Sequence, residues 1–404
     1  MDVAVIGGGA AGFFSAIHVK YNHPDASVVI IEKSNKFLSK VKVSGGGRCN
    51  VTNVEHRISE LVKAYPRGGK QLKKLFPTFS TPDTMKWFEE RGVSLVVQDD
   101  NCVFPESQNS QSVINCFLSE VNRLGITIQT GIKVKGIEPI EDGKIRLTMD
   151  EEVAVFDKII VATGGSPKRT GLSWLEQVGH EIVEPVPSLF TFNMPEEKVK
   201  DLMGVVVEKT ITKIPGTKLK SDGPLLITHW GMSGPSILKL SAFGARILSE
   251  NKYKFKVQVN WVNELNDSVV FDEVQRLVKE YSLKHLSSIR PYYLPERLWR
   301  FLLDRVGLNP DKKWNELGKK GINKIVTILT NDLYDVNGKT TFKEEFVTCG
   351  GVSWESINTK TMESKVVPNL FFAGEVLDVD GITGGYNFQA AWTTAFVAAK
   401  FNVA

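Results

Sequence analysis

Cysteine is scarce in this chain of 404 residues, and its four cysteines are widely separated: Cys49, Cys102, Cys116 and Cys349. None of them forms a C-x-x-C pair, which argues against a disulfide framework, a disulfide reductase and a metal site. No uncharged apolar run reaches the roughly 18 residues that a membrane-spanning helix needs. The first apolar segment also lacks the basic region that precedes a secretion signal. These absences predict a cytoplasmic protein with no membrane or metal partner.

A large excess of one charge is also lacking, since 50 lysines and arginines oppose 46 aspartates and glutamates. The balance is uneven along the chain. Between Thr191 and Lys343 there are 25 basic and 17 acidic residues, a net charge of 25 − 17 = +8, whereas the remainder has 25 − 29 = −4. Either this is ordinary surface variation, or the middle segment meets an anionic partner such as RNA. The hydrophobic fraction of 42% and the length predict two or three folded domains.

A dinucleotide-binding pattern opens the chain. Residues 2–6 (DVAVI) predict a buried strand, residues 10–21 a helix, and residues 27–33 (SVVIIEK) a second strand. Between the first strand and the helix, the G-x-G-x-x-G pattern places Gly7 for a sharp turn, Gly9 for close approach of a pyrophosphate and Gly12 for close helix packing. The candidate cofactor contacts here are Gly7, Gly9, Ala10, Ala11, Gly12, Glu32 and Lys33. Glu32 is placed to accept hydrogen bonds from an adenosine ribose.

A second glycine cluster lies in residues 38–53, LSKVKVSGGGRCNVTN. Its composition predicts a loop whose N–H groups wrap an anion, although a flexible linker is the alternative. The candidate contacts in this segment are Lys40, Ser44, Gly45, Gly46, Gly47, Arg48, Cys49 and Asn50, of which Cys49 is expected to be structural.

Two further segments favour FAD over NAD as the dinucleotide. Residues 158–167 (KIIVATGGSP) predict a buried strand that ends at Ala162, Thr163 and Gly164. Residues 369–400 predict a strand, a glycine-rich turn and a helix, with candidate contacts at Gly374, Glu375, Gly384, Gly385, Tyr386 and Asn387. The positive end of that helix would point at a flavin ring, where it stabilises negative charge in the reduced flavin. NAD alone would not need the last thirty residues.

These motifs together resemble the BaiN/YhiN/RdsA-like family of FAD-dependent oxidoreductases, which includes aminoacetone oxidase-type flavoproteins. The resemblance rests on GGGAAG, SGGGRCNVTN, VFPESQNSQSV, THWGMSGPSIL, TCGGV with TMESK, and GEVLDVDGITGGYNFQAAW, and it spans residues 3–400. It implies an α/β fold in which a glutathione-reductase-type Rossmann domain binds FAD and is interrupted by a β-barrel insert and a small helical subdomain. One departure is Asn101-Cys102, where family members carry Gly-Arg.

The expected domain boundaries follow from the changes in composition. Residues 1–188 form the first part of the FAD-binding domain, 189–264 the β-barrel insert and 265–335 the helical subdomain. Residues 336–348 form a return strand of the insert, and 349–404 complete the FAD-binding domain. Helices are predicted at 82–92 and 110–125. Residues 126–161 form a meander of strands on the FAD sheet, from which Val134 is placed to cover the adenine.

The predicted function is an FAD-dependent oxidoreductase. Because no second G-x-G-x-x-G occurs, the chain has no separate NAD(P)H domain, and NAD(P)H or the substrate itself reduces the flavin directly. Tyr386 is a flavin or substrate contact, or simply packs. His229 is a proton donor or substrate contact, or a buried histidine bonded to backbone. Cys349 is an acid for C=C reduction, or inert packing.

The expected reaction is reduction of an activated C=C bond of a small molecule with electrons from NAD(P)H. The alternatives are reduction of uridine in ribosomal RNA, amine oxidation by O2, and RNA binding by a protein whose flavin is mainly structural.

Overall fold

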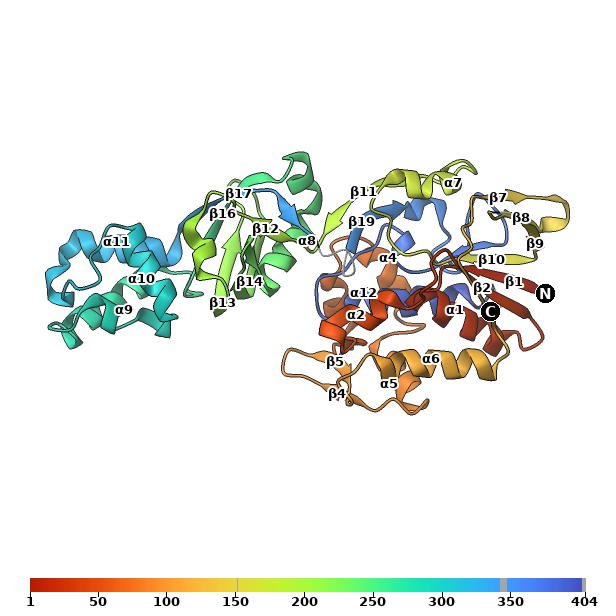
Figure 1. The fold of residues 1–404 in the computed structure, drawn as a ribbon, viewed down its shortest axis with the longest axis horizontal. Helices are drawn as coiled ribbons and strands as arrows, with labels where there is room; N and C mark the ends of the chain where they lie inside the picture. The colour runs from red at the N-terminus through yellow and green to blue at the C-terminus, as the bar shows by residue number, and fades with distance from the viewer. Residues whose placement is uncertain (151, 342–346, 402–404) are drawn as a thin grey trace. The chain divides into compact units, whose positions relative to one another are not determined.

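The computed structural model describes residues 1–150, 152–341 and 347–401 (Figure 1). The chain divides into two compact units, with residues 1–188 and 342–404 in unit 1 and residues 189–341 in unit 2. Each unit has a hydrophobic core of its own. The return strand predicted for residues 336–348 lies partly outside the described residues.

Unit 1 is built on a five-stranded parallel sheet. Its strands lie in the order β20 (Leu370–Phe372), β10 (Lys158–Val161), β1 (Asp2–Ile6), β2 (Ser27–Glu32) and β6 (Thr127–Thr130). Ile6 at the end of β1 pairs with Val161 on one side and Ile31 on the other, and Val161 also pairs with Phe372. The carboxyl ends of four strands therefore meet at one edge of the sheet, which is where open α/β sheets bind their ligands.

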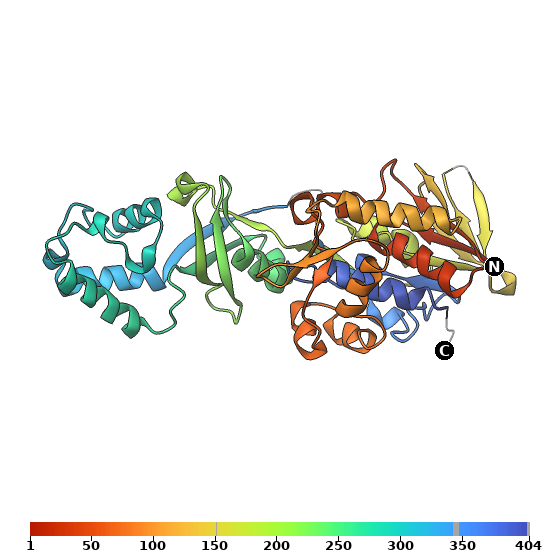
Figure 2. The same ribbon diagram turned by 90° about the horizontal axis from the view of Figure 1, so that it is seen from below.

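Two helices at the centre of unit 1 have no distinct polar face. They are α1 (Ala10–Asn22) and α12 (Tyr386–Ala398), and both are buried over most of their length. A helix without a polar face must be enclosed by other elements, and these two pack side by side (Figure 2). The other helices of unit 1 are α2 (Ser39–Gly47), α3 (Ile58–Leu61), α4 (Gly69–Leu75), α5 (Thr81–Glu89), α6 (Gln111–Arg123) and α7 (Ser173–Glu176). The helices predicted at 82–92 and 110–125 are thus confirmed as α5 and α6.

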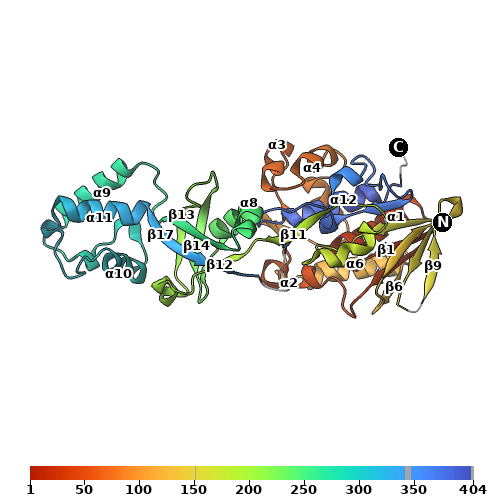
Figure 3. The same cartoon turned by 90° about the horizontal axis from the view of Figure 1, so that it is seen from above.

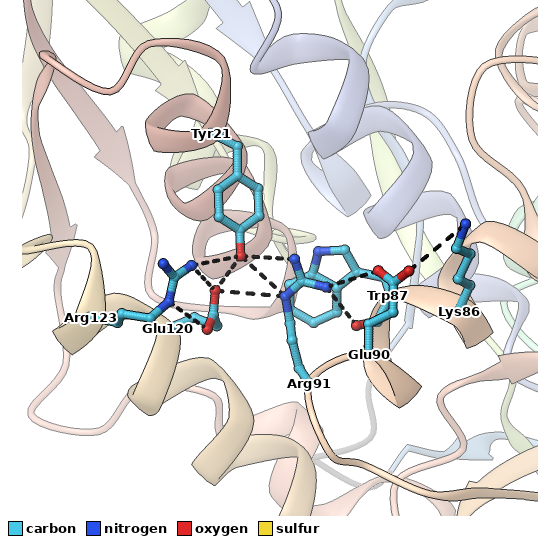
Figure 4. A network of polar contacts seen from close by, with 7 residues as sticks. All are labelled: Tyr21, Lys86, Trp87, Glu90, Arg91, Glu120 and Arg123. Atoms are coloured by element: carbon cyan, nitrogen blue, oxygen red, sulfur yellow. Dashed lines mark hydrogen bonds and ion pairs between the residues drawn. The ribbon is translucent and has the colours of Figure 1, made fainter.

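A polar network joins α1 to α5 and α6 (Figure 4). The Tyr21 hydroxyl donates to Glu120 and accepts from Arg91 at 2.9 Å. Arg91 also lies 4.2 Å from the centroid of the Trp87 ring. Arg123 lowers the pKa of Glu120 through a hydrogen bond, which keeps this carboxylate charged. The network holds both outer helices against α1.

Smaller sheets complete unit 1. One contains β3 (Thr52–Asn53), β5 (Cys102–Pro105) and β4 (Leu95–Val97) in that order. A second contains β7 (Gly136–Pro139), β8 (Ile145–Thr148) and β9 (Val153–Phe156). The third is the pair of β11 (Ile182–Ser188) and β19 (Val347–Val352). The meander predicted for 126–161 therefore divides, because β6 joins the parallel sheet and β7 to β9 form an antiparallel sheet of their own.

Unit 2 contains a seven-stranded sheet whose neighbours are antiparallel. The order is β17 (Asp332–Asn337), β16 (Lys254–Asn260), β13 (Val206–Lys213), β14 (Lys220–Ile227), β15 (Gly231–Ser233), β12 (Thr191–Asn193) and β18 (Lys339–Thr340). Helix α8 (Pro235–Glu250) packs on β14. Helices α9 (Asp267–Glu280), α10 (Glu296–Arg305) and α11 (Gly318–Thr330) gather at one end of the sheet (Figure 3). Among the described residues, none of the helices combines the length and the apolar character of a membrane span.

Candidate functional site

The first glycine turn leaves open space beside Gly9. A Cβ added to Gly7, whose φ is +111°, would lie 2.4 Å from the Ala162 carbonyl oxygen. A Cβ on Gly12 would lie 1.8 Å from the Gly7 oxygen, so α1 packs directly on the turn. By contrast, a Cβ on Gly9 meets no heavy atom within 4 Å. The turn thus has the tight bend, the close packing and the open face that a bound pyrophosphate requires, and the residues present fit a dinucleotide.

The start of α1 and the end of β2 lie beside this open face. Gly9 is the N-cap of α1 and provides no side-chain cap, and the first turn contains no acidic residue. Its N–H groups and the helix dipole therefore favour an anion. Glu32 accepts hydrogen bonds from Gly8 N at 2.7 Å and from Ser34 N at 2.9 Å, which fixes its carboxylate next to the turn. Lys33 follows it and is exposed.

The segment predicted as an anion loop starts as a helical turn. Helix α2 leaves helical geometry at Ser44, and Gly45, Gly46 and Gly47 then have φ of +58°, +69° and +84°. Gly46 has no heavy atom within 4 Å of an added Cβ. Arg48 donates to the Gly45 oxygen at 3.0 Å, and its guanidinium lies 4.2 Å from the centroid of the Phe104 ring. Arg48 therefore fixes the start of the left-handed run at Gly45, whereas the space beside Gly46 is open.

Cys49, inside this segment, is fully buried. Burial raises the pKa of its thiol to about 12. The side chain is therefore a neutral packing group at physiological pH, as its expected structural role requires.

The C-terminal segment meets the two N-terminal motifs. The Lys40 ammonium lies 2.7 Å from Glu375, and the Thr348 N–H donates to the other Glu375 oxygen at 2.8 Å. A Cβ on Gly374 would lie 2.8 Å from the Ala11 Cβ. The structure therefore brings Gly374 and Glu375 beside the start of α1 and beside α2.

Close contacts also fix the start of α12. Gly385 has φ +84°, and a Cβ there would lie 2.4 Å from the Thr52 carbonyl. With its amide oriented by the hydrogen-bond network, Asn50 accepts from Gly385 N at 3.1 Å. The Asn53 amide donates to the Gly384 oxygen at 3.2 Å, and the Asn387 side chain bonds both backbone groups of Gly381. The amino end of α12 is thus held beside the segment that follows the glycine loop.

Tyr386 is the first residue of α12 and is half-buried. Its backbone oxygen accepts a hydrogen bond from the Tyr65 hydroxyl at 2.8 Å. Burial raises the pKa of Tyr386 to about 12. Its phenol therefore keeps its proton throughout the physiological range and is able to donate it.

The remaining predicted site residues lie in different surroundings. Val134 is partly buried and packs on the core of unit 1, and Thr163 is exposed just beyond β10. Gly164 has φ +72° and open space around an added Cβ. Cys349 is buried within β19, where it pairs with Val186. The roles assigned to these residues stay predictions.

His229 belongs to unit 2, in the turn between β14 and β15. It is exposed, and its ring lies 4.7 Å from that of Trp230. The expectation of a buried histidine bonded to backbone is therefore wrong, because the turn presents the ring to solvent. Its assignment as a proton donor stays a prediction.

A buried ion pair near α12 was not predicted. The Arg67 guanidinium donates to both carboxylate oxygens of Asp380, with a distance of 2.6 Å between Arg67 Nε and Asp380 Oδ1. The Ser188 hydroxyl donates to the same carboxylate at 2.7 Å. Asp380 is fully buried, and burial raises its pKa although Arg67 opposes the shift. Thr348 and Asp380 lie in the quoted motifs TCGGV and GEVLDVDG, which offered a signal. Tyr65 and Arg67 lie in no motif.

The comparisons with known proteins identify the family. The HI0933-like protein Rossmann domain matches residues 1–401. The chain belongs to the HI0933-like Rossmann family. It is thus a member of the FAD-dependent oxidoreductases that its motifs resemble. The ribosomal RNA dihydrouridine synthase of Escherichia coli is 28% identical over 99% of this chain and 97% of that protein. The 3-dehydro-bile acid delta(4,6)-reductase of Clostridium scindens is 25% identical over 98% of each.

Solved structures agree on the fold. A 3-ketosteroid-delta4-(5alpha)-dehydrogenase from Rhodococcus jostii matches with a TM-score of 0.51 at 10% identity, over 99% of this chain and 96% of that one. A flavocytochrome c3 fumarate reductase matches with a TM-score of 0.50 at 15% identity, over 99% and 77%. The mixed α/β architecture with a Rossmann-type domain is confirmed.

Proposed function

We propose that this oxidoreductase binds FAD and uses electrons from NAD(P)H to reduce a C=C bond conjugated to a carbonyl group. The observation that carries the cofactor assignment is the meeting of three distant segments beside one sheet edge. Gly374 packs on Ala11 just after the Gly9 turn, and Glu375 pairs with Lys40 of α2, so the C-terminal segment extends the site beyond the N-terminal dinucleotide motif. FAD, when bound, supplies a two-electron centre that transfers hydride.

The names of the relatives support the reaction class. Dihydrouridine is uridine with its ring C=C bond saturated, and this bond is conjugated to a ring carbonyl. A 3-dehydro-bile acid with delta(4,6) unsaturation also has its C=C bonds conjugated to a ketone. In both cases hydride adds to the carbon remote from the carbonyl and a proton adds to the adjacent carbon. An enzyme of this class needs a residue that keeps and then delivers a proton.

Tyr386 is the residue that we assign to proton delivery. Its pKa of about 12 keeps the phenol protonated at neutral pH, and its place at the amino end of α12 lies beside the segments assigned to the cofactor. His229 and Cys349 are the alternative donors. In the same assignment the α1 amino end holds the pyrophosphate, Glu32 the adenosine ribose, and Lys40 with Glu375 the ribityl chain.

A second candidate substrate is uridine in RNA, which the net charge of +8 between Thr191 and Lys343 favours over a small neutral molecule. This segment includes most of unit 2. There the seven-stranded sheet and helices α9 to α11 support the interpretation of a barrel insert with a helical subdomain.

The test is to mix the flavin-loaded protein anaerobically with NADH or NADPH and follow the flavin absorbance. A cyclic enone, an unmodified ribosomal RNA and a primary amine are then added separately. The proposal predicts bleaching by a nicotinamide, reoxidation by the enone or the RNA, and a product that has gained two hydrogens. Bleaching by the amine alone, with reoxidation only by O2, would replace the proposal with amine oxidation.

A further inference from the structure

A groove in unit 2 is lined by three lysines and, among the residues that the structure describes, by no acidic side chain. It has a volume of about 680 Å³ and is lined by Val306, Lys319, Lys320, Asn323, Lys324 and Thr327. Five of these six residues belong to α11. Lys319, Asn323 and Thr327 follow one another at intervals of four residues, so they form a single stripe along the helix. Because each residue adds about 1.5 Å, the stripe is about 12 Å long, which exceeds the size of one phosphate group.

Two of these lysines have no acidic partner among the described residues. Lys319 and Lys320 are exposed in the first turn of α11, where the helix dipole disfavours positive charge. Lys320 and Lys324 are also like charges four residues apart, which destabilises a helix. One exposed lysine elsewhere in unit 2, Lys256, is paired with Asp335 at 2.8 Å. Among the described residues, no carboxylate therefore lies within ion-pair distance of Lys319 or Lys320.

Lys324 has a different role from its neighbours. Its ammonium donates to the Val306 backbone oxygen at 2.7 Å, just beyond the end of α10. It therefore links α11 to the end of α10 at the groove. Lys319, Lys320, Asn323 and Thr327 remain exposed on the rim, where all four are able to donate hydrogen bonds to an anion.

We propose that the groove between α10 and α11 binds the phosphate backbone of RNA and docks an RNA substrate. This inference rests on the proposed reduction of uridine in RNA. Lys319 binds a phosphate at one end of the stripe, and Lys320 binds a second phosphate from the neighbouring row of α11. Asn323 and Thr327 bond phosphate or ribose oxygens along the stripe. Such contacts position a strand and carry no sequence information, so base selection belongs to another part of the protein.

The experiment measures RNA binding by the oxidised, FAD-loaded full chain, so that turnover does not enter. The probe is a fluorescein-labelled single-stranded oligouridine, and anisotropy is recorded over a series of salt concentrations. The groove variant is Lys319→Gln with Lys320→Gln. The matched control, Lys254→Gln with Lys256→Gln, makes the same change in net charge on β16. FAD content and thermal melting of each variant check its folding.

Each neutralised phosphate contributes roughly 0.7 to 0.9 to the slope of log affinity against log salt. The lower value applies to a single strand, so loss of two contacts should lower the slope by about 1.4 and weaken binding by about 10- to 15-fold near 0.15 M salt. The control pair should change both quantities much less. Equal effects of the two pairs, or no effect of the groove pair, would overturn the groove assignment.

The RNA-binding assay and the C=C reduction assay test the groove and the proposed reaction separately. If the parent protein reduces the enone with NAD(P)H yet shows no salt-dependent RNA binding, the groove assignment is wrong and the reductase stands. If it binds RNA through Lys319 and Lys320 but reduces no C=C bond, the reaction is wrong and the docking surface stands.

Discussion

Replacement of Gly9 by alanine should separate cofactor binding from folding. The backbone of Gly9 has φ −93°, which alanine also adopts, and its added methyl group meets no protein atom within 4 Å. As the N-cap of α1, alanine is less favourable than glycine by up to about 1 kcal/mol. It also restricts the unfolded chain, which contributes about 0.4–1 kcal/mol in the opposite direction. The apoprotein should therefore be nearly as stable as the parent.

The effect on FAD should be large, because the methyl group would occupy the space assigned to the pyrophosphate. Loss of one charge-assisted hydrogen bond of about 1.5–3 kcal/mol corresponds to roughly 10- to 150-fold weaker binding. Gly12→Ala is the matched comparison. Its methyl group would lie 1.8 Å from the Gly7 oxygen, so it should destabilise the apoprotein as well as weaken FAD.

The assay combines thermal melting of the two apoproteins with FAD titration by quenching of flavin fluorescence. We expect that only Gly12→Ala lowers the melting temperature substantially, while both variants bind FAD poorly. Unchanged FAD affinity in Gly9→Ala would show that no pyrophosphate approaches this turn. A loss of stability in Gly9→Ala as large as that in Gly12→Ala would show that the open space is not present in solution.

Three further predictions concern single side chains. Glu32→Ala should weaken FAD binding by roughly 10- to 150-fold, because a charged hydrogen-bond acceptor is lost. Isothermal titration calorimetry that finds the affinity of the parent protein would show that Glu32 does not bind the ribose. Burial lowers the pKa of His18 to about 3, so below pH 6.5 the unfolded chain binds a proton that the folded chain does not. As the pH is lowered from 6.5 toward 3, the free energy of unfolding should therefore fall by about 1.4 kcal/mol per pH unit. Denaturant titrations of His18→Phe at the same pH values should lack this contribution. Tyr386→Phe should leave flavin reduction by NAD(P)H intact and slow reoxidation by the enone in stopped-flow mixing; equal reoxidation rates would remove Tyr386 as the proton donor.

The strand–turn–helix–strand at the start of the chain could be predicted from sequence because its signals are local. The apolar run of β1, the glycines of the turn and the acid that ends β2 act within about thirty residues. The same holds for α5, which has a capping box and an early proline, and for α6, whose apolar residues follow helical spacing. In these elements tertiary packing reinforces what the local pattern already favours.

The contacts that assemble the site could not be predicted in this way. Lys40 and Glu375 are 335 residues apart, and the Arg67–Asp380 pair has no local signature, because ion pairing depends on where the fold brings two side chains. The segment 38–53 was predicted as a loop, yet it begins with a helical turn that stops at the left-handed glycines. His229 was expected to be either a proton donor or substrate contact, or a buried histidine bonded to backbone. Hydrophobic periodicity does not distinguish these alternatives for a single residue in a turn.

The FAD content of the purified protein tests the central claim most directly. Heat or acid should release non-covalent FAD, and its absorbance gives the amount of flavin per chain. The account predicts one FAD per chain, either as purified or after incubation of the apoprotein with FAD. A colourless protein that takes up no added FAD would contradict the account.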